Sequence, residues 1–308
     1  VRARCAAESI FALDTALAQR QLVVGWLNRG TLHLVPAEDY RWLHSLIAPG
    51  LERPLARRRA QLGISPRVAE RAVTSITRAL SNGPAVRSRL VGLLKQQRLP
   101  SEGQAPVHLL ALAAQRGLII RGPMQGREQA YVLTDDWLGP PRSGLDRERA
   151  LAETARRYLA GHGPAADRDL SKWSGLPLTE CRKGLASISS ELAERRDGLL
   201  ALRGREAPAE RTPTLPPPRL LGAFEPLLLG WSGREEIVGE YWSKLVRGGM
   251  ISAFALVDGR AAASWRINGR KIEITPFRSV SKATQALLDA DAEAILRYLN
   301  PQEGAKAL

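Results

Sequence analysis

Gly83-Pro84-Ala85 and Gly163-Pro164-Ala165 are two copies of one tripeptide, 80 residues apart in a chain of 308 residues. Each copy follows a stretch whose apolar residues recur at helical spacing, and each leads into another helical stretch. Gly and Pro interrupt helices, because Pro lacks the amide donor and Gly leaves the backbone unrestricted. The repeated interruption predicts a duplicated helix-turn-helix unit.

The residues around the first copy predict three helices followed by a hairpin. Apolar residues at helical spacing mark the helices, and two β-prone runs are joined by the polar stretch 122–129. The helices lie within 69–80, 86–94 and 107–114, and the strands at 118–121 and 130–133. Three helices and a two-stranded hairpin are the plan of a winged helix, which we assign to residues 51–140.

The residues around the second copy repeat this plan over residues 146–204. A third helix is predicted from intervals of 3, 4, 3 and 4 between Leu178, Cys181, Leu185, Ile188 and Leu192. Its opposite face carries Thr179, Arg182 and Lys183, which suit entry into a DNA major groove. The wing is expected to begin at 199–202.

The flanking segments complete the predicted organisation. Residues 1–50 read as a first winged-helix unit, incomplete at its amino end, in which Asn28-Arg29-Gly30 forms a hairpin turn. Residues 205–219 read as a Pro-rich linker, and residues 220–308 as a β-rich domain with turns at Asp258-Gly259 and Asn268-Gly269. The predicted fold is therefore α+β: three tandem winged-helix units followed by a small β-rich C-terminal domain with a terminal helix.

The charge of the chain points to a polyanionic partner. Lys and Arg number 45 against 31 Asp and Glu, which gives a net charge of +14. Residues 51–134 contain 14 Lys and Arg against 4 Asp and Glu, so most of the excess lies there. Helix-turn-helix units on strongly basic chains favour nucleic-acid binding, and we expect double-stranded DNA as the partner.

The remaining composition argues against several other classes of protein. Only two cysteines and four scattered histidines are present, so neither a disulfide framework nor a zinc cluster is predicted. The sequence contains no apolar run of about 18 residues, the length that a membrane span needs. We expect a cytoplasmic monomer that uses no metal and no cofactor.

Four blocks of sequence, in the same order, resemble a bacterial family of tandem winged-helix proteins, the AlkZ/YcaQ-type DNA glycosylases. The first is Trp26-Leu27-Asn28-Arg29-Gly30-Thr31-Leu32-His33-Leu34, similar to the signature W-x-x-R-G-T-L-H-L. The others begin at Tyr131, Gly163 and Phe224. The resemblance covers essentially the whole chain. It implies three winged helices that form a basic concave surface, followed by a β domain.

The resemblance also implies a chemistry. Members of this family with known activity remove alkylated bases, some of them in interstrand crosslinks, by hydrolysing the N-glycosidic bond without a metal. A Gln-hydrophobic-Gln or Gln-x-Asp motif near the amino terminus supports this reaction, and Val1-Arg2-Ala3-Arg4 resembles the stretch that follows the motif. Gln19-Arg20-Gln21 has the spacing but precedes the Trp26 block, so we interpret it as a coincidence.

Three functions therefore stay open. The first interpretation is a DNA-binding protein related to base-excision enzymes, expected to excise no base with the chain as given. The alternative is an active glycosylase for alkylated or crosslinked purines, which requires the Gln-containing segment. A transcriptional regulator is the weaker third, since such regulators usually dimerise and no dimerisation helix is evident.

The candidate DNA contacts are basic or polar residues at turns, helix faces and wings. Each candidate also has a structural explanation that involves no DNA. For example, His33 can be a histidine hydrogen-bonded within the protein, and Arg57-Arg58-Arg59 can be a solvated helix face. The set comprises Arg29, Thr31, His33, Arg57, Arg58, Arg59, Arg87, Arg89, Arg127, Lys172, Thr179, Arg182 and Lys183.

Overall fold

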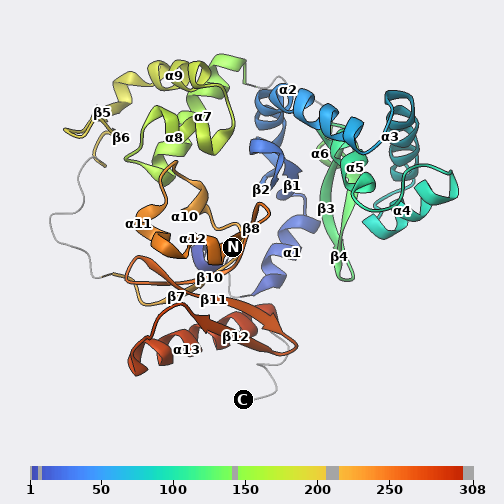
Figure 1. Cartoon of the computed structure of the whole chain (residues 1–308). Coiled ribbons are helices and arrows are strands. Elements are labelled where there is room, and N and C mark those ends of the chain that lie inside the picture. Colours follow the sequence, from blue (N-terminus) through green and yellow to red (C-terminus); the bar gives the residue numbers. More distant parts are fainter. Residues whose placement is uncertain (1, 6–8, 141–144, 206–214, 301–308) are drawn as a thin grey trace. The chain divides into compact units, whose positions relative to one another are not determined.

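The computed structural model describes residues 2–5, 9–140, 145–205 and 215–300 (Figure 1). Contacts divide the chain into two compact units. One comprises residues 14–157 and 174–189, and the other comprises residues 1–13, 158–173 and 190–308. No helix among the described residues is long and apolar enough to cross a membrane.

The first unit contains a four-stranded antiparallel sheet in the order β2-β1-β3-β4. It joins the hairpin predicted at the start of the chain to the predicted wing of the second winged helix. A single bridge, Val24 to Arg121, links the two hairpins. The strands are β1 (Leu22–Trp26), β2 (Leu32–Pro36), β3 (Ile119–Gln125) and β4 (Glu128–Leu133).

The boundary predicted between residues 50 and 51 falls inside one helix. After α1 (Ile10–Ala18) and the β1–β2 hairpin, α2 runs from Ala37 to Gln61 and contains Pro49 and Pro54. Glu38 and Asp39 lie in its first turn, where carboxylates suit the helix dipole. The helix therefore continues well beyond the end of the predicted first unit.

Three further helices and the β3–β4 hairpin surround the largest core of this unit, as the sequence predicted. The Ser65 hydroxyl caps the first helix by accepting from the Val68 amide at 3.4 Å. Ala72 and Ile76 of that helix are fully buried in the core. The helices are α3 (Pro66–Leu80), α4 (Arg87–Gln96) and α5 (Ala105–Gln115), with the short α6 (Thr134–Leu138) after β4.

Both copies of Gly-Pro-Ala make the same backbone contact. The Ala85 amide donates to the Tyr131 carbonyl at 3.1 Å, and the Tyr131 amide returns a bond to Ala85 at 2.8 Å. Ala165 and Leu200 exchange the equivalent pair of bonds, both at 2.9 Å. Each tripeptide thus adds one residue of strand to a hairpin that follows it in sequence.

The elements around the second copy match the predicted order. They are α7 (Arg147–His162), α8 (Asp167–Ser174), α9 (Leu178–Ser187), β5 (Leu192–Glu194) and β6 (Leu200–Leu202). The placement of Leu192 on the third helix was wrong, because α9 ends at Ser187 and Leu192 begins the paired strand β5. Apolar spacing alone cannot tell a buried strand residue from the next helical turn.

The C-terminal part of the second unit is a β-rich assembly with a closing helix. Its sheet has the order β12-β11-β10-β7, and the hairpins at Asp258-Gly259 and Asn268-Gly269 form as predicted. The closing helix buries Leu288, Ala292 and Ile295 in a core with sheet residues. The elements are β7 (Arg219–Leu221), β10 (Phe254–Val257), β11 (Arg260–Asn268), β12 (Lys271–Pro276) and α13 (Lys282–Leu299). Three short helices and a hairpin of two-residue strands lie between β7 and β10. They are α10 (Pro226–Leu229), α11 (Glu235–Val238), α12 (Trp242–Leu245), β8 (Val246–Arg247) and β9 (Met250–Ile251).

Most of the predicted linker, residues 205–219, lies outside the described residues, and strand β7 begins at its last residue. At the other end of the chain, the Arg2 guanidinium donates to both Asp291 oxygens at 2.9 Å. Arg4 forms an ion pair with Glu225. These contacts tie the beginning of the chain to the C-terminal assembly within the same unit.

Candidate nucleic-acid interface

The turn between β1 and β2 organises the first predicted group, Arg29, Thr31 and His33. Arg29 has a left-handed backbone conformation, with φ at 57°. The Thr31 hydroxyl donates to the Asn28 carbonyl at 3.0 Å, and His33 Nε2 lies 2.9 Å from that hydroxyl. The Thr31 and His33 side chains are thus engaged within the turn, which agrees with a structural role; a DNA contact from this group stays a prediction.

Burial lowers the pKa of His33 below its ordinary value, and the neighbouring Arg29 charge acts in the same direction. The backbone bond to Asn28 opposes this shift. His33 is therefore neutral at neutral pH and offers a hydrogen bond rather than a charge.

Arg121 was missed by sequence reasoning and lies beside Trp26, the last residue of β1. Its guanidinium is 5.5 Å from the Trp26 ring centre and 5.2 Å from that of Tyr131, and it donates to the Tyr131 hydroxyl at 3.0 Å. The two rings are stacked with centroids 6.3 Å apart. Because Trp26 and Arg121 are far apart in sequence, only the β1–β3 pairing brings them together.

The three adjacent arginines of α2 have different surroundings. Arg57 is exposed, whereas Arg58 donates to Gln61 at 3.2 Å and to Gln104 at 2.5 Å. Burial and the nearby Arg116 charge lower the pKa of Arg59. Arg57 is thus the member of this group with the freest access to a phosphate, and Arg58 helps to join α2 to the segment before α5.

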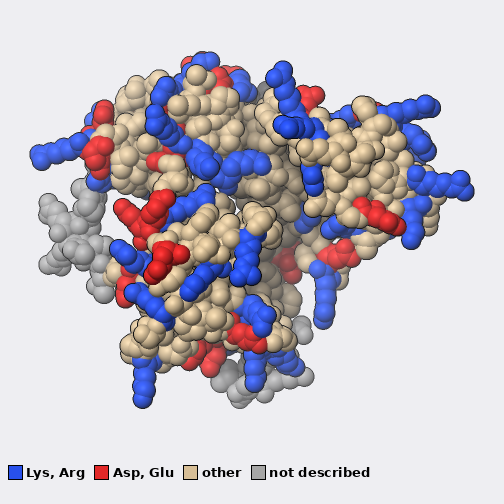
Figure 2. Space-filling view, viewed as in Figure 1, with Lys and Arg blue, Asp and Glu red and all other residues tan. Residues whose placement is uncertain are grey.

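Arg87, Arg89 and Arg127 come from two elements that the structure brings together. Glu128, at the start of β4, accepts from the Ser88 hydroxyl at 2.8 Å, so the amino end of α4 lies beside the hairpin tip. All three arginines are exposed, and none forms an ion pair within the described part of the chain. Figure 2 shows Lys and Arg projecting around α3, α4 and this tip.

Helix α9 carries the residues that the sequence predicted for entry into a major groove. Thr179, Arg182 and Lys183 are exposed on it. Lys183 is paired with Glu180 at 3.0 Å, and Glu180 also accepts from Arg147 at 2.9 Å. Lys172 of α8 is exposed too, but it belongs to the other unit.

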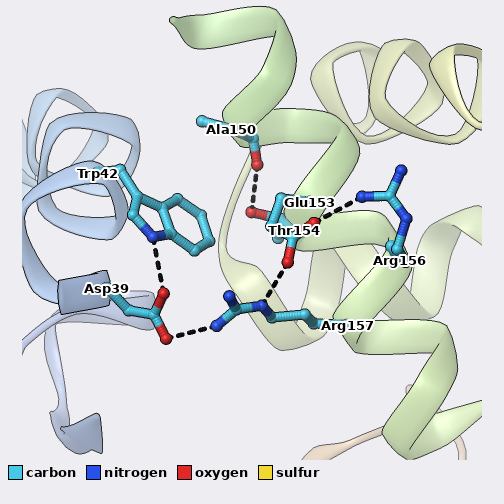
Figure 3. A network of polar contacts seen from close by, with 7 residues as sticks. All are labelled: Asp39, Trp42, Ala150, Glu153, Thr154, Arg156 and Arg157. Atoms are coloured by element: carbon cyan, nitrogen blue, oxygen red, sulfur yellow. Dashed lines mark hydrogen bonds and ion pairs between the residues drawn. The ribbon is translucent and has the colours of Figure 1, made fainter. Parts of the chain in front are cut away.

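A partly buried polar network that the sequence did not predict joins α2 to α7 within one unit (Figure 3). The Trp42 indole donates to Asp39 at 3.0 Å, and Arg157 bridges Asp39 to Glu153. The network borders an open pocket of about 560 Å³. Partial burial opposes the shift, but hydrogen bonds from Arg157 and Arg156 lower the pKa of Glu153. Glu153 is thus ionised and engaged with both arginines.

Gln19 and Gln21 lie at the end of α1 and are exposed. Between them, Arg20 takes a left-handed conformation with φ at 62° and stacks its guanidinium 4.6 Å from the Trp137 ring centre. The pair follows the last residue of α1, and its interpretation as a coincidental motif stays a prediction. Across the described ranges, no three His, Cys, Asp or Glu residues are grouped closely enough to hold a metal ion.

His162 lies in an aromatic cluster that holds α7 against α8 and the Gly230-Trp231 segment. Its ring stacks on Tyr158 with centroids 4.9 Å apart, and it contacts Trp173 and Trp231 at 5.6 and 5.2 Å. The Tyr158 hydroxyl donates to the Gly230 carbonyl at 2.7 Å. Burial, with a contribution from Arg4, lowers the pKa of His162.

Acidification is therefore expected to destabilise the protein partly through His162. Because its folded pKa is lowered, the unfolded chain binds the proton more readily, so stability is lost as pH falls below about 6.5. His162→Phe keeps a ring and removes the titration. Thermal unfolding between pH 7.5 and 5.5 should show a smaller loss of Tm in the variant, and equal losses would contradict the assignment.

Residues 1–298 match the family model described as DNA glycosylase AlkZ-like. An interstrand DNA cross-link repair glycosylase of Streptomyces sahachiroi is 28% identical over 316 residues, which cover 96% of this chain and 84% of that protein. The solved structure of Streptomyces sahachiroi DNA glycosylase AlkZ is similar in fold, with a TM-score of 0.73 and 24% identity over 96% of this chain and 84% of that one.

Proposed function

The chain belongs to the AlkZ-like DNA glycosylase family, and from this premise we propose that it removes alkylated or crosslinked purine bases from duplex DNA. The reaction is hydrolysis of the N-glycosidic bond. The observation that carries the proposal is the family match over 298 of the 308 residues. This match favours the glycosylase over DNA binding without catalysis, which the sequence had placed first.

We further propose that the DNA is held by tandem winged-helix units. The paired bonds of Ala85 with Tyr131 and of Ala165 with Leu200 support this, because each adds a short third strand to a two-stranded hairpin. In both places helices precede and follow the tripeptide, as in a helix-turn-helix with a wing. A duplicated unit of this kind gives the chain two surfaces of similar construction for one duplex.

The proposed DNA contacts differ between the second winged-helix unit, residues 51–140, and the third, residues 146–204. In the basic segment, Arg57, Arg87, Arg89 and Arg127 are exposed and suited to phosphates, which carry affinity but no sequence information. On α9, Thr179, Arg182 and Lys183 are exposed, and a B-DNA major groove admits an α-helix. We assign Lys172 and Arg29 to the same class of phosphate contacts.

The chemistry requires access to the damaged nucleotide and stabilisation of a sugar cation. The alkylated base must leave the stack or be otherwise accessible, and a polar group must place water at the sugar. The resemblance assigns that group to a Gln-containing motif. We do not assign the role to Gln19 and Gln21, because they follow α1 and precede the Trp26 block, where the resemblance places no such motif.

Base excision is the expected result when the protein is incubated with a duplex that carries one 7-alkylguanine. Strand cleavage at abasic sites after alkali treatment reports the reaction, and the unmodified duplex of the same sequence is the control. Release from the alkylated duplex above spontaneous depurination supports the proposal. No release from alkylated or crosslinked duplexes would count against it.

A further inference from the structure

In most winged helices the third helix reads DNA. In the basic segment, residues 51–134, the third helix of the proposed winged helix is α5, and it is buried. Eight of the eleven residues of α5 are buried, and its sequence contains no Lys, Arg or Asn. It packs within the main core of its unit. If the basic segment binds DNA, its contacts must therefore come from a surface other than α5.

Helix α3 carries such a surface, which the sequence reasoning did not single out. At 100° per residue, Arg71 and Arg78 lie within about 40° of Arg67 around the helix axis, so the three form one row. Arg67 and Arg78 are separated by about 16 Å along the axis. All three are exposed, and Thr74, also exposed, lies in the same row. We call Arg67, Arg71 and Arg78 the arginine ridge.

The ridge has no carboxylate to balance it. The single acid of α3, Glu70, is occupied by Arg116, which donates to it at 2.8 Å. Among the described residues, no ion pair involves any of the three ridge arginines. Like charges one turn apart destabilise a helix, so this array is better suited to an anionic partner than to solvent.

A groove continues the ridge toward α4. It has a volume of about 600 Å³ and lies between Arg78 of α3 and Arg89 of α4. The lining also includes Ser75, Asn82, Gln96 and Gln97, and contains no acidic residue. Hydroxyl and amide groups beside two guanidinium groups are the donors that proteins use on phosphate oxygens.

We propose that the arginine ridge and the α3–α4 groove bind the sugar-phosphate backbone of duplex DNA. The length of the ridge, about 16 Å, is enough to span several successive phosphates of one strand. The contact anchors the duplex without reading its sequence, while the exposed face of α9 remains for base edges. This inference rests on the proposed function, because it takes DNA as the partner.

The test compares three pairs of substitutions in the whole protein by fluorescence anisotropy with an unmodified 20-base-pair duplex. Arg71→Ala/Arg78→Ala removes two ridge charges, and Arg71→Lys/Arg78→Lys retains them. Arg278→Ala/Lys282→Ala removes the same charge from exposed positions at the start of the closing helix segment. Circular dichroism confirms that each variant is folded.

The alanine ridge pair is expected to weaken affinity about tenfold or more at 50 mM salt. Its plot of log affinity against log salt should be shallower by about 1.8, since each phosphate contact contributes about 0.9. The lysine pair should stay near wild type, and the Arg278/Lys282 control should change affinity by about twofold or less. Equal losses in the ridge and control pairs would overturn the inference, because they would reflect net charge alone.

Excision measured on the same preparations separates the two proposals. If wild type excises the alkylated base and the ridge pair keeps wild-type affinity, the inference fails and the proposed function stands. If wild type neither binds nor excises, both fail. Vesicles of anionic phospholipid test a different partner for the ridge. If the ridge substitutions weaken binding to these vesicles but leave DNA affinity unchanged at the same salt concentration, the inference is overturned.

Discussion

Duplex affinity is expected to fall about a thousandfold between 50 and 200 mM monovalent salt. The reason is the release of condensed counterions: each phosphate neutralised by Lys or Arg contributes about 0.9 to the logarithmic slope, so six contacts give a fall of this size. The basic segment 51–134, with 14 Lys and Arg against 4 Asp and Glu, supplies more than enough cations. Anisotropy titrations with one unmodified duplex at four salt concentrations measure the slope.

The same titration with a duplex of different sequence is the control, since phosphate contacts carry no sequence information. Similar slopes for both sequences are expected. Affinity that changes less than about threefold over this salt range would contradict a phosphate-dominated interface.

Gly184→Ala is expected to destabilise the protein by about 2 kcal/mol. A Cβ at this position in α9 would lie 2.6 Å from the Leu151 carbonyl oxygen of α7, which is a backbone atom and cannot rotate away. The two helices would have to separate, and overpacking of this kind costs about 1–3 kcal/mol. Urea unfolding, with the midpoint and slope fitted together, measures the change.

Gly92→Ala in α4 is the matched control. No atom lies within 4 Å of its added Cβ, and Ala is the better helix former, so this change should stabilise by about 0.5–1 kcal/mol. Opposite signs for the two substitutions are the expected outcome. A stabilising Gly184→Ala would mean that α9 does not approach α7 as closely as described, and the placement of Thr179, Arg182 and Lys183 would need revision.

The elements that local rules specify were predicted well. Gly-Pro-Ala breaks, period-3.6 apolar faces and the turns Asp258-Gly259 and Asn268-Gly269 each act within a few residues, so they are visible in the sequence. The long helix α2 was not predicted in full, because Pro49 and Pro54 normally weaken a helix interior. Here each Pro removes one local hydrogen bond while the helix continues through it.

The side-chain surroundings of the candidate site could not be predicted in the same way. Asp39 meets Arg157 across 118 residues of sequence, and Arg58 meets Gln104 across 46. Such partners depend on how helices pack, for which the sequence has no local signal. The difference between Arg57, which is exposed, and Arg58, which is engaged, likewise follows from packing.

Mass spectrometry of the products from a duplex with one 7-alkylguanine shows directly whether the protein is a DNA glycosylase. We expect a free alkylated base and an unbroken DNA strand with one abasic site, formed faster than in a protein-free control. Intact alkylated DNA after prolonged incubation, under conditions where the protein is bound to the duplex, would contradict this expectation.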